Sequence, residues 1–219
     1  MAKIIRRVAN ELKNHAPFTL FGGLTGIIIM LVLFFGNFLP YVSPISKNIF
    51  YILHPTHVFL SALVTTTLYV KYGKRKIWLA ILIGYTGSIG IATISDSIIP
   101  YLGEVILDLP NPGVHIGFIE EPLLTNTPAF VGILIGYYLK GTTKFPHAGH
   151  VLISTWASLF HIIMALGVTV NWIQTMGIFI FLFLAVWLPC CTSDIVYPLL
   201  FVRKGQALSS HSKAHKVLA

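Results

Sequence analysis

Residues 77–102 read IWLAILIGYTGSIGIATISDSIIPYL, and the only charged side chain in this long apolar run is that of Asp96. About 20 apolar residues are enough to span the hydrocarbon core of a bilayer as a helix. A carboxylate inside such a span is costly in lipid, so it faces the interior of a helix bundle and is a functional candidate by default. The stretch therefore predicts a transmembrane helix that carries a functional carboxylate.

The composition of the whole chain also indicates a membrane protein. Of its 219 residues, 55% are hydrophobic and only 10% are charged, whereas about a quarter of the residues of a soluble domain are charged. The formal net charge is +8, but the basic residues lie in short clusters between apolar runs, as they do in cytoplasmic membrane loops. We therefore expect the lipid bilayer as a partner and no nucleic acid.

Five further apolar runs accompany residues 77–102, so we expect an all-α polytopic protein with six transmembrane helices. The second run is short unless His54 and its neighbours extend it. Residues 40–53, which contain Pro44, are expected to form a loop and a short interfacial helix. The predicted spans are residues 18–39, 57–72, 77–102, 123–139, 151–170 and 173–202.

The basic residues predict the orientation of these spans. If the N-terminus is cytoplasmic, every one of the 15 Lys and Arg residues except Lys47 falls in a cytoplasmic segment, as the positive-inside rule requires. The segment 103–121 is acidic and then lies outside. We expect a multi-pass protein of the cell membrane with both termini in the cytoplasm.

Two polar motifs each occur twice in the chain. The pattern H-x-x-H-V-x-x-S-x-x-x-[ST] runs from His54 to Thr65 and again from His147 to Ser158. The pattern S-D-x-[IV]-x-P-x-L contains Asp96 in its first copy and Asp194 in its second. Because both motifs recur in the same order on matching predicted helices, they indicate an internal repeat.

Each copy of the repeat contains three spans, an odd number, so the second copy enters the membrane from the opposite side. We expect a single membrane domain, residues 1–219, with repeat A at about 17–102, repeat B at about 122–202 and a cytoplasmic tail at 203–219. The motif residues of repeat A then lie toward the outer face and those of repeat B toward the cytoplasm. Pro100 and Pro198, four residues after each Asp, are expected to break their helices.

The repeated histidines and aspartates predict a metal site in each half. His-x-x-His places two imidazoles on one helix face, and an Asp from a neighbouring helix completes a three-ligand set for zinc or a similar divalent metal. A proton relay and an ordinary interfacial histidine are the alternatives. The candidate ligands are His54, His57 and Asp96 in the first half and His147, His150 and Asp194 in the second.

Other polar residues share the same helix faces, at about 100° per residue. Such faces must meet the bundle interior, a water-filled path or a partner, although hydrogen bonding between helices is the simpler explanation. The residues expected to line a path are Ser61, Thr65, Ser154, Ser158 and His161. Cys190 and Cys191 could be metal ligands or packing residues. His115, Glu120 and Glu121 could form an outer cation site or belong to a solvated loop.

These features favour a small secondary transporter or exporter that moves a cation or metal-linked solute through two symmetry-related sites by alternating access. An enzyme needs only one such site, so we favour transport over catalysis. The alternative is an intramembrane metal-dependent hydrolase that acts on a lipid or peptide. Histidine ligation of haem is a third possibility, which Pro55 and the short histidine spacing disfavour. Glycine spacing and the small size allow a homodimer.

Overall fold

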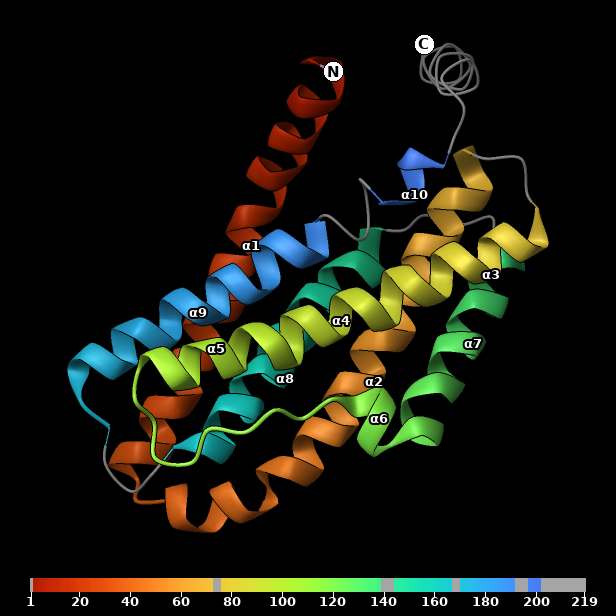
Figure 1. The fold of residues 1–219 in the computed structure, drawn as a ribbon. Coiled ribbons are helices and arrows are strands. Elements are labelled where there is room, and N and C mark those ends of the chain that lie inside the picture. The colour runs from red at the N-terminus through yellow and green to blue at the C-terminus, as the bar shows by residue number, and fades with distance from the viewer. Residues whose placement is uncertain (1, 73–75, 139–143, 167–169, 192–196, 202–219) are drawn as a thin grey trace.

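A computed structural model describes residues 2–72, 76–138, 144–166, 170–191 and 197–201, and within these ranges the chain is a bundle of helices without a strand (Figure 1). The long elements are α1 (Ala2–Phe35), α2 (Leu39–Tyr72), α7 (Pro122–Tyr138), α8 (Lys144–Ala165) and α9 (Trp172–Cys191). Between α2 and α7 lie α3 (Ile77–Tyr85), α4 (Ile91–Thr93), α5 (Ile99–Ile106) and the short α6 (Gly117–Glu120). A last short helix, α10, covers Tyr197–Leu200.

Four helical stretches in the described part of the chain are long and apolar enough to cross a membrane: Ala16–Phe35, Leu39–Lys71, Ile77–Ile106 and Trp172–Cys190. A shorter apolar stretch, Gly149–Ala165, lies in α8. The all-helical class is thereby confirmed, and the four candidate spans agree with a helical membrane protein. The number of six spans and their orientation stay predictions.

The surface of the bundle is apolar while much of its interior is polar. On α1, large side chains at intervals of three or four residues are more than half exposed, among them Phe18, Phe21, Ile28 and Val32. By contrast, Asp96 and several histidines have almost no accessible surface. An apolar exterior of this extent is what a protein needs when lipid rather than water is its solvent.

Residues 40–53 were predicted to form a loop and a short interfacial helix. The loop is wrong, because all of these residues belong to the continuous helix α2. Pro44 and Pro55 both lie inside this helix, and each removes one backbone hydrogen bond. Burial of Phe50 and Tyr51 outweighs that local cost. The long helix changes direction along its length (Figure 1), as proline-containing helices do. His54 therefore lies in the middle of α2 rather than at the start of a span.

The helical stretch from residue 77 to residue 106 is continuous but is not a regular α-helix. It contains two π-helical turns, η1 (Thr86–Gly90) and η2 (Ile94–Ile98), and Asp96 lies in the second. The Ile99 N–H donates to the carbonyl oxygen of Ile94, so a π turn precedes Pro100 where a break was expected. π turns are frequent at functional sites.

Two glycine pairs bring neighbouring helices close together. A Cβ added to Gly132 would lie 2.5 Å from the carbonyl oxygen of Phe59, and one added to Gly136 would lie 2.6 Å from that of Leu63. These glycines let α7 approach the backbone of α2, its main partner along with α8. A Cβ added to Gly22 would lie 2.8 Å from the hydroxyl oxygen of Thr155 in α8, whereas one added to Gly26 would make only ordinary contacts, at 3.6 Å, with Leu159 of α8 and Leu182 of α9. These contacts lie within one chain, and the possible homodimer stays a prediction.

Residues 107–116 connect α5 to α6 across one end of the bundle, which we call the loop end (Figure 1). The Asn111 N–H donates to the carbonyl oxygen of Ala165 at 3.2 Å, which attaches the connection to the end of α8. α6 then packs on the start of α7 and on α2. The connection therefore covers the polar interior at this end.

Candidate functional site

Asp96 lies at the centre of a buried polar cluster built by α2, η2 and α8. Its Oδ2 atom is 3.0 Å from Nδ1 of His54 and 2.6 Å from Nδ1 of His57. Its Oδ1 atom accepts hydrogen bonds from the hydroxyls of Ser95, at 2.7 Å, and Ser154, at 2.8 Å. The structure thus brings together three of the predicted site residues of the first half and one residue of the second.

The four contacts determine which ring nitrogens of the histidines are available to a ligand. An ionised carboxylate can accept about four hydrogen bonds, which matches two imidazole N–H groups and two hydroxyls. In the neutral tautomer that donates to Asp96, each histidine carries its proton on Nδ1 and its lone pair on Nε2. A histidine that ligates a metal commonly donates its other N–H to a carboxylate in this way.

The Nε2 atom of His57 faces a set of residues from the second half of the chain. It lies 3.9 Å from Sγ of Cys190, and the rings of His57 and His150 stack at 4.9 Å with an angle of 11° between their planes. One ligand atom from each of these three residues lies within 4.8 Å of the other two, and all three residues are buried. This trio is a candidate metal site to which both halves of the chain contribute.

The Nε2 atom of His54 faces in a different direction, toward α6. A Cβ added to Gly117 would come within 2.7 Å of this nitrogen, so only glycine fits here. Neither this nitrogen nor the hydroxyl of Thr125 beside it has a hydrogen-bond partner among the described residues. The opposite face of the imidazole stacks on Phe50 at 5.2 Å.

The second predicted site is described only in part. Asp194 lies outside the described residues, and the side chains of His147 and Cys191 are also outside them. His150 is buried next to His57 rather than in a separate inner site. In the described part of the chain, the residues of the two halves therefore meet in one cluster.

The predicted path residues are all buried. Ser158 donates to the carbonyl oxygens of Ser95, at 3.1 Å, and of Ser154, at 2.9 Å, so it joins α8 to η2. Ser61 and Thr65 lie on α2 beyond the histidines, and Thr65 packs against Gly87 in η1. The burial of these path residues agrees with a role in helix packing and equally with a role in lining a transport path.

A second buried acid–histidine pair lies nearer the loop end. Nδ1 of His161 is 2.7 Å from Oε1 of Glu104, and both side chains are at most 1% exposed. The other oxygen, Oε2, accepts the Gly113 N–H at 3.1 Å. The sequence reading included His161 but missed Glu104, because Glu104 follows the apolar run and was counted with the acidic loop. Glu104 lies two residues before the end of the helical stretch at Ile106, and the apolar residues Val105 and Ile106 that follow it were the available signal.

Four side chains form an ionic cluster over this pair: Lys47, Tyr51, His115 and Glu120. Glu120 Oε2 accepts from the Tyr51 hydroxyl at 2.7 Å and lies 3.4 Å from the Lys47 ammonium, and its Oε1 is 3.2 Å from Nδ1 of His115. Partial burial raises the pKa of Glu120, but the bonds from Tyr51, His115 and Lys47 outweigh it and hold the pKa below 4.5. Glu121 is exposed.

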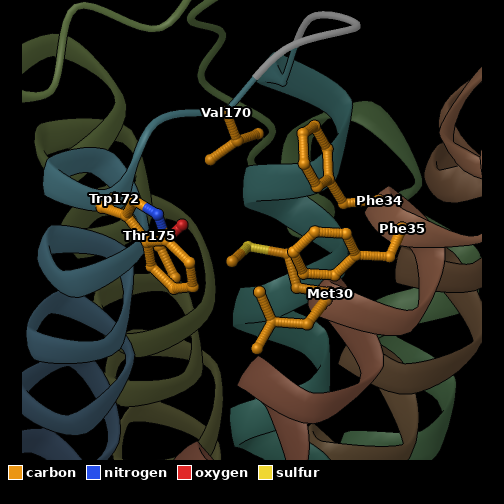
Figure 2. Close-up of a pocket in the computed structure, with 7 residues that line it drawn as sticks. Met30, Phe34, Phe35, Val170, Trp172 and Thr175 are labelled. Carbon is orange, nitrogen blue, oxygen red and sulfur yellow. The ribbon is translucent and has the colours of Figure 1, made fainter.

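A separate pocket of about 160 Å³ lies between α1 and the beginning of α9 (Figure 2). Its lining is almost entirely apolar, with Thr175 as the one hydroxyl-bearing residue, and it is remote in the fold from Asp96. It is lined by Met30, Leu31, Phe34, Phe35, Val170, Trp172 and Thr175. Such a lining offers no group for acid–base chemistry or for binding a metal.

No protein-family model, curated protein or solved structure matches this chain. The fold and the site define a class only in general terms: a helical protein with four candidate membrane spans in its described residues, which encloses a buried cluster of Asp, His, Ser and Cys side chains.

Proposed function

We propose that the protein is a small membrane transporter that carries a transition-metal cation through the site formed by His57, His150 and Cys190. The observation that carries this proposal is the arrangement around His57: Asp96 holds its Nδ1, while its Nε2 faces Cys190 and His150. Asp96 has both oxygens engaged, so in this proposal it positions the ligands instead of binding the metal.

The donor set supports a borderline or soft metal. Imidazole and thiolate favour zinc, copper and similar ions, whereas magnesium and calcium favour oxygen ligands. In a tetrahedral zinc site the ligand atoms are about 3.3–3.6 Å apart, and the three ligand atoms already lie within 4.8 Å of one another. Movements of about 1 Å would bring them to an ion, and a fourth position stays open for a solute or water.

Alternating access is the transport mechanism that we propose, with six spans, cytoplasmic termini and the 3+3 inverted repeat. The ligands support it, because His57 comes from the first half of the chain and His150 and Cys190 come from the second. A site shared by two halves can open to either face when the halves move against each other.

An intramembrane hydrolase that acts on a lipid or peptide is the second candidate. Three protein ligands with an open fourth position are also the arrangement of catalytic zinc, which activates water there. The hydroxyl of Ser154, to which the Cys190 thiol donates at 3.6 Å, would lie close to such a water. This candidate predicts turnover of a substrate, not movement of the metal.

The test is metal uptake by proteoliposomes that contain a zinc-sensitive dye. We expect the wild-type protein to admit Zn²⁺ faster than empty liposomes do. Asp96→Asn should lower the initial rate about 10- to 100-fold, the usual cost of losing a carboxylate that orients a metal-bound histidine. Uptake equal to that of empty liposomes would contradict the transport proposal.

Thr93→Val is the matched control for this experiment. Thr93 is buried one turn before Asp96, and its hydroxyl bonds only to the carbonyl of Ile89 in its own helix, at 2.7 Å. The substitution removes a buried polar atom from the same segment but leaves the cluster intact. Its uptake rate should stay within about twofold of wild type.

A further inference from the structure

The Glu104–His161 pair belongs neither to the proposed metal site nor to the hydrogen-bonded cluster around Asp96. A carboxylate and an imidazole 2.7 Å apart, both almost fully excluded from solvent, are expensive to keep in a membrane unless they have a function. The Nε2 atom of His161 has no hydrogen-bond partner among the described residues, so the pair can accept a further proton there.

The pair lies between the loop end and the metal site. Toward the loop end, the ring of His161 meets that of His115 at 5.4 Å, and His115 is partly exposed. Toward the metal site, the ring of Phe50 contacts His161 edge-on at 5.4 Å and stacks on His54 at 5.2 Å. Phe50 thus separates the two acid–histidine clusters, and an aromatic hydrocarbon ring cannot carry a proton.

We propose that Glu104 and His161 form the proton-binding site of a metal–proton antiporter, separated by Phe50 from the metal site. This inference rests on the proposed transport function and names the ion that is exchanged. The pair takes one proton from water at the loop end, by way of His115. It passes from a net charge of -1, with one proton between Oε1 of Glu104 and Nδ1 of His161, to a net charge of zero, with Glu104 ionised and His161 an imidazolium that carries the added proton on Nε2.

The charged and titratable surroundings of the pair support this role. Three side chains from other segments face His161: Glu104 of α5, His115 of the connection at the loop end, and Phe50 of α2, whose ring cannot titrate. On the other side of α8, α1 and α9 contribute apolar residues such as Met30 and Ile178. Beyond His115 lies Glu120 with Tyr51 and Lys47. An added positive charge in this setting favours the departure of a nearby cation.

The experiment measures protons and metal together in proteoliposomes that contain a pH dye and a zinc dye. In the wild type, zinc entry should release protons, and an imposed pH gradient should drive zinc uptake. Glu104→Gln should keep Zn²⁺ binding to the purified protein within about twofold but reduce proton movement per zinc ion at least tenfold. Glu104→Asp should restore part of the coupling, and Glu121→Gln, which removes an exposed carboxylate, should leave it unchanged.

The possible results separate this inference from the transport proposal. Wild-type protein that moves no zinc contradicts the proposed function. Wild-type protein that moves zinc without protons, or Glu104→Gln protein with an unchanged ratio of protons to zinc, overturns the inference alone. If Glu104→Gln protein does not elute as a single species in gel filtration, His161→Gln provides the same test with the same two outcomes.

Discussion

At the scale of single residues, His54 and His57 differ in what their Nε2 atoms face. Asp96 binds Nδ1 of both His54 and His57, yet Nε2 of His54 faces Gly117 and Nε2 of His57 faces Cys190. Of these two histidines, His57 is the one whose Nε2 faces potential co-ligands among the described residues. The cysteine among them makes the preference for soft metals testable at Cys190 alone.

Cys190→Ser should lower the affinity for Cd²⁺ much more than that for Mn²⁺, because the hydroxyl replaces a soft ligand with a hard one. In protein loaded with Co²⁺, the absorption due to charge transfer from thiolate to cobalt should be present in the wild type and absent in the variant. The measurements are metal titrations and absorption spectra of purified protein. Equal loss of affinity for both ions would indicate that Cys190 serves packing only.

A pH-dependent contribution to stability is expected from Glu120. Because its folded-state pKa lies below the ordinary value of 4.5, its contacts contribute fully above pH 4.5 and are lost as the pH falls through the lowered value. The difference in melting temperature between wild type and Glu120→Gln should therefore be constant above pH 4.5 and shrink below it. A difference that is independent of pH would show that these contacts carry no ionic contribution.

The sequence predicted the members of the site better than their roles. Residues such as His54, His57, Asp96 and Ser154 share repeated motifs, so their spacing alone brought them into one set. Glu104 was missed because it follows the predicted span and was counted with the acidic loop, whereas the helix continues to Ile106. The contact between His57 and His150 results from tertiary packing.

At the scale of elements, the glycines of α7 determine how closely α2 can approach. The two backbones are near enough that a Cβ on Gly132 would lie 2.5 Å from a carbonyl oxygen, and a backbone atom cannot move aside as a flexible side chain can. This close packing holds the segment of α2 that follows His57.

Gly132→Ala should destabilise the protein by about 1–3 kcal/mol, as overpacking generally does. Gly90→Ala is the control, because a Cβ there meets nothing within 4 Å and alanine favours a helix by about 0.5–1 kcal/mol over glycine. Reversible unfolding in mixed detergent micelles gives the free energies of unfolding of both variants. Similar losses in the two variants would show that the α2–α7 contact is looser than described here.

Element boundaries were predicted well where a polar or basic segment interrupts the apolar runs, as at the start of the stretch from residue 77 and at α7. They failed at residues 40–53, where Pro44 suggested a loop. A local pattern reveals the hydrogen bond that the proline removes, but not the stabilisation that comes from burying Phe50 and Tyr51. The same limitation applies to Pro100, where two π turns keep the helix continuous.

At the scale of the whole molecule, the distribution of polarity is reversed relative to that of a water-soluble protein. Large apolar side chains cover the outside and ionisable groups occupy the centre, which agrees with the low charge of the sequence. Composition could therefore predict the class. It could not predict that both halves of the chain supply one cluster.

The proposed inverted repeat makes a prediction about Asp194, the counterpart of Asp96 in the second motif. If the halves alternate in exposing one shared site, Asp194→Asn should impair zinc flux in proteoliposomes to a degree similar to that of Asp96→Asn. An intramembrane hydrolase would instead lose turnover through one substitution and tolerate the other. Flux and hydrolysis of a lipid mixture, measured on the same preparations, distinguish these outcomes.

The orientation is testable with single cysteines in a variant that lacks Cys190 and Cys191. Reporters placed near residue 3 and near residue 213 should both be shielded from a membrane-impermeant maleimide in intact cells, while one at residue 112 should be labelled. The reason is the positive-inside distribution of Lys and Arg. Labelling at residue 3 with protection at residue 112 would reverse the assigned sides.

The two π turns have one more consequence, which concerns chain length. Each π turn holds one more residue than the α-helical turn that it replaces, so the stretch from residue 77 to residue 106 accommodates two surplus residues. Deleting one of the residues Ile94–Ile98 other than Asp96 would restore α-helical pairing and leave the residues on either side on nearly the same helix faces. A deletion in a regular α-helical part of this stretch would instead rotate all preceding residues by about 100° relative to those that follow, and would disrupt the alignment of Asp96 with α2 or α8 more.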